Sequence, residues 1–78
     1  MLTGSQVRAA KAMLRWSGDE LAQKAGISLS SVRRIEANDG MPTDQSMRTL
    51  IAVKSALEAA GIEFIGTPDD KPGVRIKG

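Results

Sequence analysis

Residues 17–37, SGDELAQKAGISLSSVRRIEA, contain two start signals for helices, one on each side of a glycine. Ser17 and Glu20 have the S-x-x-E spacing of a capping box. The apolar face after it consists of Leu21, Ala22 and Ala25. Gly26 ends that face, because glycine takes a positive φ at no steric cost, and Ser28 is a second N-cap. The stretch predicts two short helices joined by a tight turn.

The exposed side of the second helix is basic. At 3.6 residues per turn, one side collects Leu29, Ser30, Arg33 and Arg34, and the other collects Ser31, Val32 and Ile35. The basic side suits the major groove, where arginine bonds guanine and leucine contacts a thymine methyl. The alternative is a solvated face that carries two arginines by chance. The helix, turn and helix around it favour DNA reading.

Composition limits the chemistry open to this chain. The 78 residues predict one domain with a net charge of +2, and they include no His, Cys or Tyr. We therefore expect no enzyme, no catalytic residue, no metal site and no cofactor. No apolar run resembles a signal peptide or approaches the ~20 residues of a membrane span. The expectation is a soluble, cytoplasmic protein that does not bind membranes.

The N-terminal segment predicts a first helix. Thr3 and Gln6 form a T-x-x-Q capping box. Helical spacing gives an inner face of Val7, Ala10, Met13 and Leu14. Trp16 is predicted to end this helix and to cover the core, rather than to stack on a nucleic-acid base, because one ring is a poor stacking platform.

The segment after the second short helix predicts a loop and a long helix. Asn38-Asp39-Gly40 stops the preceding helix. Thr43 is the expected cap of a helix from Asp44 to Ala60, the longest of the chain, which Gly61 ends. Its predicted inner face consists of Met47, Leu50, Ile51, Leu57 and Ala60.

The last residues change period. Ile62–Ile65 and Val74–Ile76 are short β-prone runs on either side of GTPDDKPG. They pair as a hairpin or with a second copy of the chain, and the alternative is a disordered tail over 68–78. We divide the chain into a helix-turn-helix domain, 1–61, and a β or tail segment, 62–78, that serves dimerisation.

Over residues 3–60 the chain resembles the phage repressor and Cro type of helix-turn-helix, the XRE family. The framework positions of that family hold Leu21, Ala22, Gly26, Ile27, Val32, Ile35 and Glu36. The resemblance implies a mostly α fold, a four- to five-helix repressor-like domain with a short C-terminal β segment. The GIEFI…GVR tail lies outside the common five-helix core and resembles the tails of small bacterial regulators.

The resemblance also implies roles for single residues. Base-reading positions hold Ser28, Leu29, Ser30 and Arg34, and Arg33 falls where a base or phosphate contact is common. Lys11 and Glu36 occupy the positions of a structural ion pair. We expect Ser17 and Lys24 to help bind phosphates. Gly18 stands where members often carry a glutamine that contacts DNA, so that contact is absent.

Two functional hypotheses follow. The first is a sequence-specific regulator, a repressor, that binds double-stranded DNA as a homodimer, since one small domain reads only one half-site. The second is an antitoxin-like module whose tail, 62–78, covers a partner protein. A tail that is disordered until a partner binds would favour the second. A single-stranded or RNA ligand is disfavoured, because Trp16 and Phe64 are the only aromatic residues.

Overall fold

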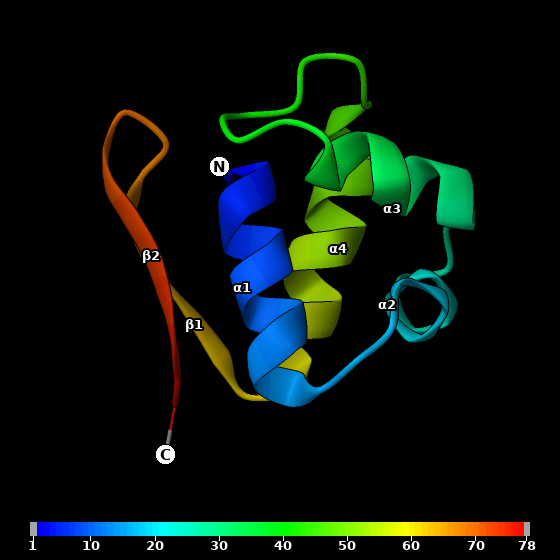
Figure 1. The fold of residues 1–78 in the computed structure, drawn as a ribbon, viewed down its shortest axis with the longest axis horizontal. Helices are drawn as coiled ribbons and strands as arrows, with labels where there is room; N and C mark the ends of the chain where they lie inside the picture. The colour runs from blue at the N-terminus through cyan, green and yellow to red at the C-terminus, as the bar shows by residue number, and fades with distance from the viewer. Residues whose placement is uncertain (1, 78) are drawn as a thin grey trace.

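The computed structural model describes residues 2–77 as four helices followed by a hairpin (Figure 1). The elements are α1 (Gly4–Leu14), α2 (Gly18–Ala25), α3 (Leu29–Glu36), α4 (Met47–Ala59), β1 (Ile62–Thr67) and β2 (Asp70–Ile76). This confirms the predicted mostly α fold with a short C-terminal β segment. No helix within 2–77 is long and apolar enough to cross a membrane.

The predicted caps of the first three helices are all present. Thr3 and Ser17 each accept the amide of the residue three positions on, and the Gln6 and Glu20 side chains accept the cap amides in return. Ser28 caps α3 by accepting the amide of Ser31. Each cap satisfies donors that a helix start otherwise leaves unpaired, so local sequence positions these three helices.

Two predicted helix ends were wrong. α1 stops at Leu14 rather than Trp16, because Arg15 takes the left-handed conformation at φ 58°. α4 starts at Met47 with Ser46 as its cap, and Thr43 lies in the preceding loop. Thr and Ser are both good caps. The loop before α4 passes α1, where the Gly4 amide donates to the Gly40 carbonyl (N···O 3.0 Å), and the helix begins only after it.

One hydrophobic core joins all four helices and the first strand. Its members are Leu2, Val7, Ala10, Leu21, Ala22, Val32, Ile35, Leu50, Val53, Leu57 and Ile62. Trp16 is half-buried against this core, the covering role predicted for it. Phe64 and Val74 pack on the core from the hairpin. The last strands therefore contribute to the same core as the helices.

Three residues predicted to face the core are exposed. They are Met13, Met47 (53 % exposed) and Ile51 (48 % exposed). α4 buries the line of Leu50, Val53 and Leu57 instead, and Val53 was missed. Met13 lies ~100° around α1 from Leu14, and Met47 and Ile51 lie on one flank of α4. Apolar type alone did not show which side of each helix would be covered.

The C-terminal segment is an antiparallel hairpin within one chain, so the disordered alternative was wrong for the described residues; Gly78 lies outside them. The register pairs Ile62 with Ile76 and Phe64 with Val74, and a bulge falls between Ile65 and Thr67. β2 packs on α1 and β1 packs on α4. The hairpin thus covers the side of the helices opposite α3 (Figure 1).

A buried glutamine fastens the hairpin to α1. Gln6 is only 4 % exposed. Its Nε2 donates to the carbonyl oxygens of Gly73 (2.9 Å) and Ile65 (3.4 Å), while its Oε1 accepts the Thr3 amide (2.8 Å). Because buried polar groups need partners, the same side chain that caps α1 also fixes the position of both strands.

Candidate nucleic-acid interface

The turn between α2 and α3 sets the angle at which α3 leaves the core. Gly26 takes the left-handed conformation at φ 69°, and the Ile27 amide donates to the Ala22 carbonyl (3.0 Å). Ile27 is half-buried, and Val32 is buried one turn into α3. The apolar side of α3 therefore packs inward, which leaves its opposite side in solvent.

Leu29 lies against the start of α2. A Cβ placed on Gly18 would lie 3.0 Å from Leu29 Cδ1, tighter than ordinary van der Waals contact. Leu29 is half-buried and packs on the core, so only part of it reaches the surface. Gly18 thus leaves room for Leu29. A larger residue at position 18 would displace this leucine.

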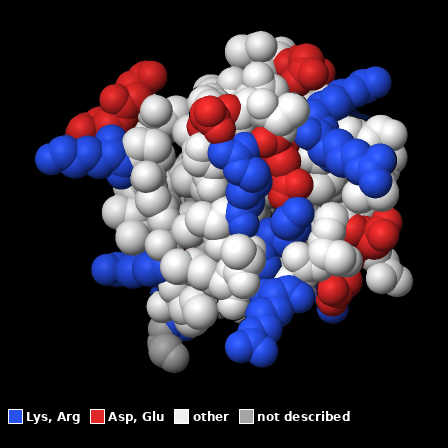
Figure 2. Space-filling model, viewed as in Figure 1, with Lys and Arg blue, Asp and Glu red and all other residues white. Residues whose placement is uncertain are grey.

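The exposed side of α3 carries two cations. Ser30, Arg33 and Arg34 are all exposed. Within residues 2–77 neither guanidinium has an ion pair or a side-chain hydrogen bond. Figure 2 shows basic side chains reaching into solvent at the upper right, where α3 lies in Figure 1. This face is therefore free to bind an anionic or acceptor-rich ligand.

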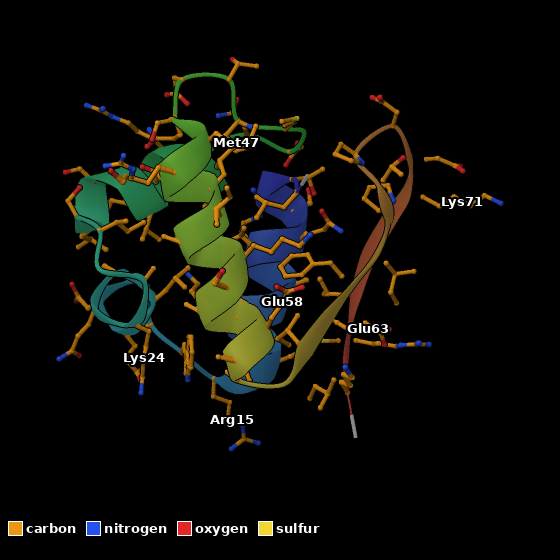
Figure 3. All side chains as sticks on the ribbon, turned by 180° about the vertical axis from the view of Figure 1, so that it is seen from behind. Arg15, Lys24, Met47, Glu58, Glu63 and Lys71 are labelled. Carbon is orange, nitrogen blue, oxygen red and sulfur yellow. The ribbon has the colours of Figure 1, made fainter. Side chains whose placement is uncertain are left out.

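The other predicted contacts are placed differently. Ser28 Oγ accepts the Ser31 amide and donates to Ser31 Oγ (both 3.1 Å), so both hydrogen-bonding functions of this hydroxyl are used inside α3. Ser17 Oγ accepts the Glu20 amide, which leaves its own hydrogen free to donate. Lys24 extends from the side of α2 away from α3 (Figure 3), with Nζ 5.8 Å from the Trp16 ring centroid. Lys24 is thus separate from the α3 face.

Lys11 and Glu36 lie on the inner side of α3 and bridge it to α1. Lys11 Nζ is 2.6 Å from Glu36 Oε1 and 3.0 Å from Oε2, so the ammonium reaches both carboxylate oxygens. Their side chains are 21 % and 15 % exposed. A partly buried pair of this kind holds two helices together but offers no free charge to a ligand.

Arg8 is a structural residue that sequence reasoning missed. It donates to the Glu36 carbonyl, to Asp39 Oδ1 (2.5 Å) and to Ser5 Oγ (3.1 Å). The signal that could have found it is its position three residues before Lys11, on the same side of α1. Arg8 and Lys11 each pair with a carboxylate at or just past the C-terminal end of α3, and Arg8 also donates to a carbonyl there.

The comparison with known families agrees with this geometry. The profile of the helix-turn-helix family HTH_3, of the XRE type, matches residues 7–53, which span α1 to the middle of α4. The chain belongs to the helix-turn-helix family. It is a DNA-binding regulator of that general type. No curated protein matches its sequence.

Proposed function

We propose that this helix-turn-helix protein is a sequence-specific transcriptional repressor that binds duplex DNA as a homodimer in the cytoplasm. The observation that carries the proposal is the presence of two guanidinium groups on the exposed side of α3 that have no partner within residues 2–77. Arg33 and Arg34 lie beside the exposed Ser30, on a helix whose other side is held in the core. This presentation suits a helix that enters the major groove.

The contacts divide into base reading and phosphate binding. Arg34 and Ser30 read base edges, and the exposed part of Leu29 contacts a thymine methyl. Arg33 and the Ser17 hydroxyl bind phosphates on either side, with the amides at the start of α3. Ser28 holds the start of α3 in position, because its side chain caps this helix. Lys24 adds long-range attraction, because it extends from the side of α2 away from α3 (Figure 3).

The homodimer follows from the size of the reading face. One α3 spans eight residues and reaches few base pairs. Two copies on half-sites about 34 Å apart would supply the specificity that a regulator needs. Repression is the simpler outcome, since an occupied operator blocks transcription without any further surface, whereas activation needs a contact with the transcription machinery.

The alternative is an antitoxin-like module that binds a partner protein through residues 62–78. Its expected mark was a tail that orders only with that partner. The hairpin instead forms within a single chain and contributes Ile62 to the core. That observation favours the DNA-binding homodimer, although a protein can bind both ligands.

Selection of bound sites from random duplex DNA tests the proposal. We expect a two-fold symmetric sequence with half-sites one helical turn apart. For a dimer that neutralises ~6 phosphates, the slope of log affinity against log salt should be about −5. A slope near zero, or no enrichment of any sequence, would rule out the proposed function.

A further inference from the structure

The hairpin leaves the outer edge of β1 without a strand partner. The Lys77 amide donates to the Gly61 carbonyl (2.6 Å). Because bonded and non-bonded pairs alternate in an antiparallel ladder, the odd-numbered residues of β1 bond to β2. The backbone groups of Ile62 and Phe64 then point to the open edge. Within residues 2–77 no backbone group from another element bonds there.

The flank of α4 next to this edge carries two exposed apolar residues in its first half and the charged Lys54 and Glu58 in its second half. Met47 and Ile51 lie one turn apart on it and are each about half exposed. Lys54, further along the same helix, has Nζ 5.7 Å from the Phe64 ring centroid, which places this flank beside β1. Seen from behind, α4 and β1 are the elements nearest the viewer, with Met47 and Glu58 labelled on α4 (Figure 3). The free edge and this flank, with its two apolar residues Met47 and Ile51, therefore lie on one face.

The two edges of the hairpin differ in charge. β2 and the residue after it carry three cations, Lys71, Arg75 and Lys77, against one acidic residue, Asp70, and Pro72 has no amide to donate. Two copies of β2 would oppose cations, and lysine and proline are common guards of sheet edges. β1 carries only Glu63, which is paired with Arg75. The β1 edge is thus the one that a second copy can approach.

We propose that the β1 edge and the Met47–Ile51 flank of α4 bind a second copy of this chain, which joins the hairpins into a four-stranded antiparallel sheet. The proposal rests on the homodimer proposed above and names its surface. Phe64 lies opposite Phe64 of the second copy, and Glu63 lies opposite Ile65 of the second copy. A register centred on Glu63 would oppose two carboxylates. A register centred on Ile65 would place the Phe64 ring opposite Gly66, which has no side chain, whereas the proposed register places Ile62 opposite Gly66.

This symmetry also fits one DNA duplex. Antiparallel strands within one sheet are related by a two-fold axis perpendicular to the sheet, so the helices of both copies lie on the same side of it. In each copy α3 lies on the side of the helices away from the hairpin (Figure 1). Both copies of α3 therefore face the same way, toward a duplex that lies across the axis.

Disulfide trapping tests the register, because the chain has no cysteine of its own. Glu63→Cys and Ile65→Cys are made as separate variants and oxidised alone and mixed. Residues directly opposite have Cβ atoms about 4.5–5.5 Å apart. We expect the mixture to give a cross-linked dimer and each variant alone to give much less. A Lys71→Cys and Lys77→Cys mixture is the matched control on β2, and cross-linking there instead would overturn the proposed edge.

Sedimentation equilibrium tests the α4 flank. Ile51→Glu places a charge in the proposed contact. The control, Met13→Glu, places a charge on α1 at a methionine that is about as exposed as Ile51. We expect Ile51→Glu to raise the dimer Kd at least tenfold and Met13→Glu to leave it unchanged, with helical content intact in both. Equal Kd values would overturn the proposed surface. If the unmodified protein does not bind duplex DNA, that result would instead refute the proposed function.

Discussion

α3 is flanked by two sets of cations that do different work. On its inner side Lys11 from α1 is bonded to Glu36, and just past its C-terminal end Arg8 from α1 is bonded to the exposed Asp39. On its outer side, Arg33 and Arg34 have no partner within residues 2–77. A paired cation stabilises the fold and is unavailable to a ligand, whereas an unpaired one leaves its charge for phosphates or bases. Charge alone would not separate the two sets, but their partners do.

The largest expected effect on stability comes from the close backbone contact between Gly4 at the start of α1 and the C-terminal end of α3. A Cβ on Gly4 would run into the carbonyl oxygens of Asn38 and Ile35, at the end of α3. We expect Gly4→Ala to lower the free energy of unfolding by about 3 kcal/mol or more, because backbone cannot yield as a side chain can. Gly40→Ala, where the added Cβ meets nothing within 4 Å, is the control in the same urea titration. Equal losses would contradict this reason.

The next effect comes from breaking the inner ion pair. Lys11→Met leaves the Glu36 carboxylate partly buried without its cation, and should cost up to ~3 kcal/mol of stability. The outer-side control, Arg33→Met, should change stability by less than about 0.5 kcal/mol. Once each affinity is corrected for the folded fraction, Arg33→Met should lower DNA affinity more than Lys11→Met does. A Lys11→Met protein that melts at the wild-type temperature would remove the distinction between the two sides.

Arg34→Ala tests the outer set directly. We expect a loss of about 1–3 kcal/mol in binding to the selected site and a relaxed preference at one base pair of each half-site. Stability should stay unchanged. The measurement compares affinity for the selected site and for random duplexes at one salt concentration. A uniform loss on both would make Arg34 a phosphate contact rather than a base reader.

The smallest effect concerns a pair at the surface of the hairpin. The hydrogen bond from Arg75 holds the pKa of Glu63 below its usual value. A carboxyl with a lowered folded pKa adds stability above its unfolded pKa and loses it as the pH falls through the folded pKa. We expect the small Tm difference between wild type and Glu63→Gln at pH 7 to vanish under acid conditions. A difference that is constant with pH would exclude the ion pair as its cause.

Local rules were sufficient wherever the governing contacts lie within one turn. Ser17, Ser28 and Gly26 act on backbone groups a few residues away, so the two helices and the turn could be read from their spacing. The basic face of α3 was also predictable, because helical geometry alone groups Ser30 with Arg33 and Arg34.

Rules of this kind failed where several local solutions were equally good. Thr43 and Ser46 are both capping residues by type, and only the structure shows that Ser46 caps α4. Met47 and Ile51 have the apolar character of core residues but lie on a flank that no element within residues 2–77 covers.

The sequence by itself determined the helix-turn-helix and its exposed basic face, because caps, turns and helical periodicity are short-range. Only the tertiary structure decided which cations are paired, since Arg8 and Asp39 meet across the fold. It also decided where the hairpin lies, because the carbonyl groups that Gln6 binds come from the other end of the chain. Contacts between distant segments depend on how all elements pack at once, and residue spacing does not encode that arrangement.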